Sequence, residues 1–227
     1  MLVIASVVTV VMMASDLLRP FLLPVMFLNT HIHELAHAFA ALLTGGLPER
    51  IEIYANGSGV TPVSGGNVLV VGSAGYLGAS LFGAWLIWFA RDDQRARWVL
   101  NGLAFLLLAS LLILVRGNWV GPVTAIFLSA TCYFLARMND PYPIFFAQLI
   151  GVQQCLNSLQ SVWTVFKISR YPMAASDARI LEQATGVPAT GWSALWVVIS
   201  LVFVAVALRR VATEGPKRPP KAPRSVA

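Results

Sequence analysis

The chain has 227 residues, of which 57% are hydrophobic and only 11% are charged. A soluble domain usually carries about 25% charged residues, so this composition, with a mean hydropathy of +0.72, excludes an ordinary soluble protein. The net charge of +6 does not indicate nucleic-acid binding, because the basic residues lie between and after apolar runs, as in the cytoplasmic loops of membrane proteins. We therefore expect an all-α polytopic membrane protein surrounded by lipid, with no separate soluble domain.

Apolar runs dominate the chain. A membrane helix needs roughly 20 mostly apolar residues, and seven runs reach or approach this length: residues 1–18, 21–43, 67–90, 98–116, 119–137, 143–166 and 191–208. We expect about six to seven transmembrane helices in one domain, residues 1–209. Residues 210–227 are basic and rich in proline, which predicts a disordered tail. The first run has no basic residues before it, so we expect a retained helix rather than a cleaved signal peptide.

The basic residues also predict the orientation in the membrane. If the loop 91–97 and the tail are cytoplasmic, the count of seven spans places Arg19 and Arg137 on the same side. This arrangement predicts an integral membrane protein whose C-terminal tail is cytoplasmic. The two cysteines, Cys132 and Cys155, lie in apolar segments and form no CxxC pair, so a redox function is not supported.

Two stretches differ from the apolar runs. Residues 49–66 hold short β-prone segments around Asn56-Gly57, a strong turn signal, and predict a small β-hairpin directly after the second run. Residues 167–190 are amphipathic, and Ser176 is placed to cap a short helix there. The run 67–90 is rich in glycine, alanine and serine, which lets helices approach closely in lipid.

The second run contains His33-Glu34-Leu35-Ala36-His37. On a helix, residues four apart share one face, so both imidazoles can bind a single Zn²⁺. Glu34 can then act as general base on the attacking water. Ionisable groups inside an apolar run are costly and usually functional. The motif thus predicts a zinc metalloendopeptidase, with a pair of buried, hydrogen-bonded histidines as the structural alternative.

A third metal ligand is needed, because a catalytic zinc usually has three protein ligands. His31 lies about 200° from His33 around the helix, so we expect it either to contact a neighbouring helix or to support the site without binding the metal. Among the remaining carboxylates, Asp177 and Glu182 are the best candidates for the third ligand. We prefer Asp177, although composition alone makes it little better than the other carboxylates. Cys155 is a weaker candidate.

The run 143–166 carries a polar stripe in an apolar setting. Its members are amides and a hydroxyl: Gln153, Gln154, Asn157, Gln160 and Ser161. Such a stripe faces either a cavity or another helix. It could line a water path to the metal or hold a substrate peptide, and hydrogen bonding between helices is an equal alternative.

Residues 29–46, with the histidine motif at their centre, resemble the first core helix of the site-2-protease family of intramembrane zinc metallopeptidases, and in particular its small bacterial B-type branch. The resemblance covers most of residues 21–208. Further similar stretches are 57–61, 72–78, Ser176-Asp177-Ala178, and Gly186-Val187-Pro188 followed by Trp192. The first motif is specific, whereas the later ones are less so.

The resemblance implies a helical core around a zinc ion that water can reach, and cleavage of transmembrane protein substrates. His33 and His37 match the metal ligands of the family, and Glu34 its catalytic glutamate. The third ligand in the family is usually an aspartate in a Leu-Asp-Gly type motif, which this chain lacks, and Asp177 is the predicted substitute. That departure leaves an inactive pseudoprotease that binds membrane proteins as the alternative function. A transporter is less well supported, since inverted repeats are not evident.

Overall fold

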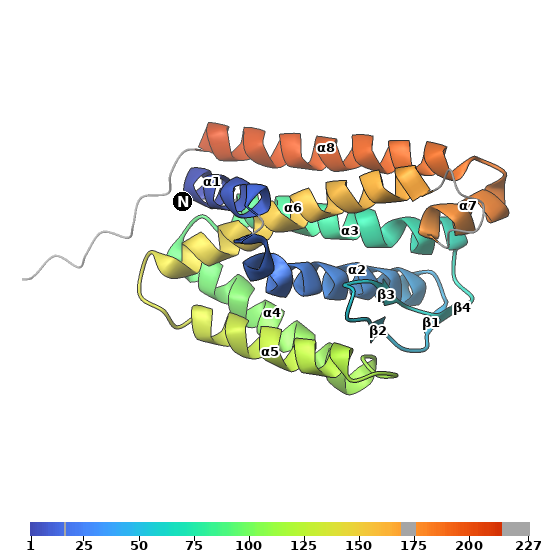
Figure 1. The fold of residues 1–227 in the computed structure, drawn as a ribbon, viewed down its shortest axis with the longest axis horizontal. Coiled ribbons are helices and arrows are strands. Elements are labelled where there is room, and N and C mark those ends of the chain that lie inside the picture. The colour runs from blue at the N-terminus through green and yellow to red at the C-terminus, as the bar shows by residue number, and fades with distance from the viewer. Residues whose placement is uncertain (16, 169–175, 215–227) are drawn as a thin grey trace, which may run out of the picture.

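The computed structural model describes residues 1–15, 17–168 and 176–214, and most of them are helical (Figure 1). The helices are α1 (Leu2–Ala14), the 3₁₀ helix η1 (Arg19–Leu22), α2 (Leu23–Leu43), α3 (Val68–Phe89), α4 (Asp93–Ile113), α5 (Val120–Leu135), α6 (Tyr142–Ile168), α7 (Asp177–Thr185) and α8 (Ala189–Glu214). Each of the seven predicted apolar runs is largely helical in the structure, and α4, α6 and α8 extend beyond their runs, so the helical assignment from sequence is confirmed.

Helix α3 lies at the centre of the bundle. It packs against α2, α6, α7 and α8, whereas α4 and α5 pack mainly against each other. In Figure 1, α8 runs along one edge of the bundle and α5 along the opposite edge. The residues that α3 presents to its neighbours therefore decide how closely the other helices can approach.

Glycines on α3 permit these close approaches. A Cβ added at Gly78 would lie 2.7 Å from the Cβ of Ala36 on α2. A Cβ added at Gly83 would lie 2.8 Å from the carbonyl oxygen of Gly151 on α6. Both distances are too short for real carbon contacts, so only glycine fits. The predicted role of the small residues in helix packing is confirmed at these positions.

Two small antiparallel sheets follow α2. Strand β1 (Leu47–Pro48) pairs with β4 (Val63–Ser64), and β2 (Glu52–Ile53) pairs with β3 (Gly59–Val60). The side chains of Ile51 and Ile53 are fully buried in a cluster with residues of α2 and α5. Burial of these two side chains fixes the strands to the bundle at the end where α7 also lies (Figure 1).

The Asn56-Gly57 turn closes the inner pair of strands. Gly57 has a φ of +84°, which only glycine adopts at little cost, and the Asn56 side chain accepts a hydrogen bond from the Ser58 backbone N–H. The carbonyl of Gly57 accepts a hydrogen bond of 2.7 Å from the Thr30 hydroxyl on α2. The turn is therefore held against the helix that carries the histidines.

Three helices of the described chain are long and apolar enough to cross a membrane: α3, α4 and α8. Helices α1 and α5 are apolar but shorter. Helices α2 and α6 have 21 and 27 residues, but their histidines, carboxylate and amides lower their mean hydropathy. The structure thus supports an integral membrane protein, while the expected six to seven spans stay a prediction.

The C-terminal part departs in one respect from the expected boundaries. Helix α8 continues to Glu214, beyond the predicted domain end at residue 209. Residues 215–227, which make up most of the predicted disordered tail, lie outside the described residues. The short helix expected after Ser176 is present as α7, and the Ser176 hydroxyl caps it by accepting the backbone N–H of Arg179 at 3.3 Å.

We expect Gly83→Ala to destabilise the protein by about 1–3 kcal/mol, because the new methyl group forces α3 away from the α6 backbone. Gly102→Ala on α4 is the matched control, since a Cβ there meets nothing within 4 Å and alanine favours a helix. The measurement is the unfolding midpoint of each full-length variant in detergent. Equal midpoints for the two variants would contradict this account of the packing.

Candidate metal centre

His33 and His37 meet on the buried face of α2. Their Nε2 atoms are 3.1 Å apart, and the rings meet edge to face. The Nδ1 atom of His37 lies 2.7 Å from the carbonyl oxygen of Val71 on α3. Because a carbonyl can only accept, Nδ1 carries the proton in this contact, which leaves Nε2 as the nitrogen that can bind a metal when the imidazole is neutral.

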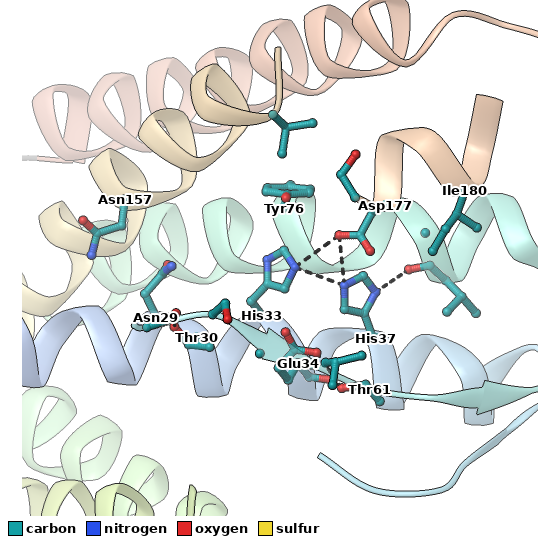
Figure 2. Close-up of a pocket in the computed structure, with 18 of the residues that line it drawn as sticks. Asn29, Thr30, His33, Glu34, His37, Thr61, Tyr76, Asn157, Asp177 and Ile180 are labelled. Carbon is teal, nitrogen blue, oxygen red and sulfur yellow. Dashed lines mark hydrogen bonds and ion pairs between the residues drawn. The ribbon is translucent and has the colours of Figure 1, made fainter. Parts of the chain in front are cut away.

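Asp177 completes a cluster of three groups. One of its carboxylate oxygens, Oδ2, lies 3.4 Å from the Nε2 atoms of both His33 and His37 (Figure 2). Burial alone would raise the pKa of the Asp177 carboxyl, but the hydrogen bonds and charges of the two imidazoles outweigh it and hold that pKa below its usual range. This shift favours the ionised carboxylate, which is the form that binds a cation.

Helix α7 is placed by the packing that brings Asp177 to this point. Asp177 is its first residue, and the carboxylate there is favoured by the helix dipole. One turn later, the fully buried Leu181 lies over Gly72 on α3, where an added Cβ would be 2.7 Å from the leucine Cδ2. Because Gly72 has no side chain, α7 can pack close enough to α3 to place Asp177 beside the two histidines.

The three donor atoms fit a tetrahedral metal ion. Ligand atoms about 2.0–2.1 Å from zinc at tetrahedral angles lie about 3.3–3.4 Å from one another, and the observed separations are 3.1, 3.4 and 3.4 Å. Among the described residues, His33, His37 and Asp177 form the one group of three potential ligands that are close enough to share an ion. These residues could therefore hold a metal.

Gly75 on α3 faces the same point. A Cβ added there would lie 2.3 Å from Nε2 of His33 and 2.5 Å from Nε2 of His37, which is close to where a shared metal would bind. The missing side chain leaves this space free. A fourth glycine of α3 is thus required by the site itself rather than by helix packing.

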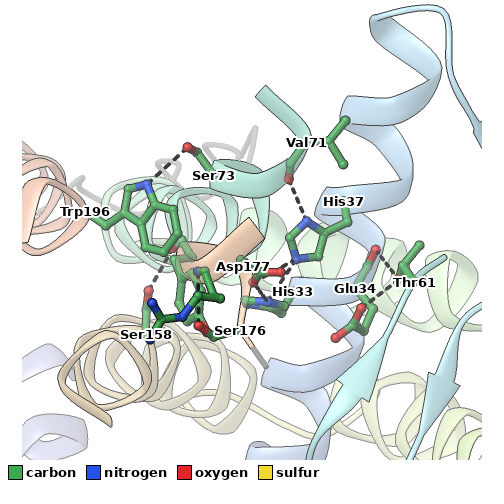
Figure 3. Close-up of polar contacts among 12 residues, drawn as sticks. His33, Glu34, His37, Thr61, Val71, Ser73, Ser158, Ser176, Asp177 and Trp196 are labelled. Carbon is green, nitrogen blue, oxygen red and sulfur yellow. Dashed lines mark hydrogen bonds and ion pairs between the residues drawn. The ribbon is translucent and has the colours of Figure 1, made fainter. Parts of the chain in front are cut away.

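Glu34 is buried beside the histidines, with 3% of its surface exposed. The Thr61 hydroxyl donates a hydrogen bond of 2.7 Å to its Oε2 atom (Figure 3). Strand β3 covers the carboxylate, because a Cβ at Gly59 would lie 2.6 Å from Oε1. The strands thus fix the orientation of the carboxylate that the sequence assigns as general base.

A cavity of about 1110 Å³ opens over these groups. It is bounded by α2, the strands, the first turns of α3, and parts of α6 and α7. Asn157 and Gln160 of the polar stripe line it, whereas Gln153 and Gln154 are buried in the bundle. Two members of the stripe therefore face the cavity, whereas the amide nitrogens of Gln153 and Gln154 lie between helices without a hydrogen-bond partner in the described part of the chain, so hydrogen bonding between helices is not found for these two groups.

The remaining sequence candidates lie away from the centre. The Nε2 atom of His31 is 2.9 Å from the Thr124 hydroxyl on α5, which confirms the expected contact with a neighbouring helix. Glu182 forms an ion pair with Arg179 on its own helix. Cys155 is buried against α3, with its sulfur 3.9 Å from the carbonyl of Ser80.

Three residues at the site received no role from the sequence: Thr61, Gly75 and Tyr76. Thr61 follows strand β3, whereas Gly75 and Tyr76 are neighbours on α3, and no local sequence pattern connects either segment to the motif on α2. The signal that could have found them is their position in the stretches 57–61 and 72–78, which resemble the family.

The fold and site together define a helical membrane protein with a motif of the metallopeptidase type. In a comparison with family models, the chain matches the Peptidase M50B-like family over residues 2–207. The chain therefore belongs to this family, which is the site-2-protease group. Membership implies a membrane metallopeptidase, since the family consists of membrane proteases that act on membrane proteins. Comparisons with curated proteins and with solved structures gave no match.

We expect Gly75→Ala to abolish metal binding, because its methyl group occupies the space between the two Nε2 atoms. The measurement is the metal content of the purified full-length protein by mass spectrometry. Gly102→Ala, again with open space around it, should retain the metal. A full complement of metal in Gly75→Ala would show that the ion does not bind at this point.

Proposed function

We propose that the chain is an intramembrane zinc metalloprotease that hydrolyses peptide bonds of membrane-associated proteins. The observation that supports this most strongly is that His33, His37 and Asp177 converge within 3.4 Å beside the buried Glu34 carboxylate. Two imidazoles and one carboxylate are a common ligand set of catalytic zinc, which leaves a position for water. Zinc is also the metal of the family.

The chain's own residues account for the proton transfers. Zinc supplies a Lewis acid that polarises the carbonyl and makes water acidic enough to ionise near neutral pH. Glu34 accepts a proton from the attacking water and later donates it to the leaving nitrogen. Thr61 holds the carboxylate for both transfers through its hydrogen bond. Glu34 is 3% exposed and lines the cavity, so its carboxylate meets water only from that side.

The substrates we propose are transmembrane proteins. A cavity of about 1110 Å³ can hold several residues of an extended peptide, and most of its walls come from helices of an apolar bundle. The basic tail would lie in the cytoplasm of a bacterial cell, with the protein in the plasma membrane. Lipid surrounds the helices, and nucleic acid has no part in the function.

We expect Glu34→Gln to lower kcat by about 10²–10⁴-fold, because the amide cannot accept the proton of water. Bound zinc should stay at one ion per chain, since Glu34 is not a ligand. The assay is cleavage of a pool of fluorogenic transmembrane peptides by the full-length protein in lipid, with metal content measured in parallel. Cleavage by Glu34→Gln at the parental rate would exclude this role for the glutamate.

We expect Asp177→Asn to weaken zinc binding by more than about 100-fold, since a neutral amide is a poor ligand and the loss of outer hydrogen-bond partners alone costs 10–100-fold. Glu182→Gln is the matched control, because it removes a carboxylate from the same helix that pairs with Arg179. The measurement is a zinc titration against a competing chelator. Equal affinities in the two variants would mean that Asp177 is not a ligand.

An inactive pseudoprotease remains the second candidate, and the missing Leu-Asp-Gly motif is the observation that favours it. Such a protein would bind membrane partners without cleaving them. The two functions differ in the parental protein itself. Absence of zinc from it, together with no effect of His33→Ala on metal content or on cleavage, would support the pseudoprotease.

A further inference from the structure

Tyr76 lies directly beside the candidate metal centre without belonging to the sequence motif. Its ring meets the His33 ring edge to face, with 4.6 Å between the centroids, and the side chain lines the cavity. Figure 2 shows it next to both His33 and Asp177. Only 8% of Tyr76 is exposed, so its position is fixed by the protein rather than by solvent.

The packing around Tyr76 explains why an aromatic ring is present at this position, but it gives no role to the hydroxyl group. The ring stacks on the fully buried Trp196 of α8 at 4.9 Å. The indole N–H of Trp196 donates to the Ser73 hydroxyl at 3.1 Å, and the Ser158 hydroxyl donates to the backbone carbonyl of Tyr76 at 2.8 Å (Figure 3). Phenylalanine would preserve all of these contacts.

The hydroxyl of Tyr76 forms no hydrogen bond with any residue in the described part of the chain. This hydroxyl is on a side chain that lines the cavity, and its oxygen is not among the polar atoms that are closed off from solvent without a partner, so a ligand in the cavity can reach it. The neighbouring polar groups are otherwise engaged, since Thr61 donates to Glu34 and Nδ1 of His37 contacts Val71. Tyr76 therefore offers a free and rigidly held donor beside the histidines.

Peptide hydrolysis needs such a donor. When water adds to the carbonyl carbon, a C–O bond forms and the π electron pair moves onto the carbonyl oxygen, while Glu34 takes the water proton. When the intermediate collapses, that pair re-forms the carbonyl, the C–N bond breaks, and Glu34 returns the proton to nitrogen. The negative charge on the oxygen is transient, and fixed donors that face it lower the barrier.

We propose that the Tyr76 hydroxyl donates a hydrogen bond to the scissile carbonyl oxygen and stabilises its negative charge, which makes Tyr76 a catalytic residue. This inference rests on the proposed proteolytic function. Asn157 is the alternative donor, because it also lines the cavity, but it lies farther along the cavity from His33 than Tyr76 does (Figure 2).

Tyr76→Phe is the direct test, in the full-length protein in lipid with the same pool of transmembrane peptides. We expect kcat to fall about 10²–10³-fold, the usual effect of removing one such donor, with KM and zinc content unchanged. A phosphinic analogue of a cleaved peptide, which imitates the tetrahedral intermediate, should bind Tyr76→Phe more weakly than the parent. Asn157→Ala tests the alternative donor, and Gly102→Ala, whose added Cβ meets nothing within 4 Å, should leave kcat and the binding of the analogue unchanged.

The outcomes separate this inference from the proposed function. If the parent cleaves and Glu34→Gln does not, proteolysis stands, and parental kcat in Tyr76→Phe overturns only the role of Tyr76. Loss of zinc or of folding in Tyr76→Phe also overturns it, because the hydroxyl would then be structural. A large loss of kcat and of analogue binding in Asn157→Ala alone assigns the donor to Asn157. A parent that cleaves none of the peptides counts against the proposed function itself.

Discussion

The architecture depends on the close approach of other segments to one helix, α3. At Gly72, Gly75, Gly78 and Gly83 an added Cβ would lie within 3 Å of an atom from a neighbouring element. These four positions face α7, the two imidazoles, α2 and α6 respectively. In lipid the hydrophobic effect does not drive helices together. Tight van der Waals contact between the helix backbones has to stabilise the bundle instead. The glycines thus determine both the bundle and the distance between the histidines and their neighbours.

Local sequence features predicted the parts of the structure that depend on local geometry. The spacing of His33 and His37 fixes them on one helical face, Asn56-Gly57 specifies a turn, and Ser176 caps the helix that follows. Apolar runs located the helices, because each run is long enough to be helical by itself. The number of membrane spans is not determined in this way. Helices α2 and α6 are long, but they carry polar groups that face the interior of the bundle, and these groups lower the mean hydropathy of both helices.

The rest of the site depends on tertiary packing and could not be deduced from spacing. Asp177 was preferred over other carboxylates only narrowly, because what brings it to the histidines is the contact of Leu181 with Gly72. The hydrogen bond from Thr61 to Glu34 likewise depends on the burial of Ile51 and Ile53, which fixes the strands. Such contacts join residues far apart in the chain and leave no periodic pattern.

The position of Asp177 late in the chain has a consequence for biosynthesis. A ribosome makes the N-terminal part first, so α2 reaches the membrane with His33, Glu34 and His37 long before α7 exists. Helix α7 packs against both α3 and α8, and its docking therefore requires nearly the whole chain. A nascent chain would therefore hold the two histidines without Asp177 beside them until its last helix has been made.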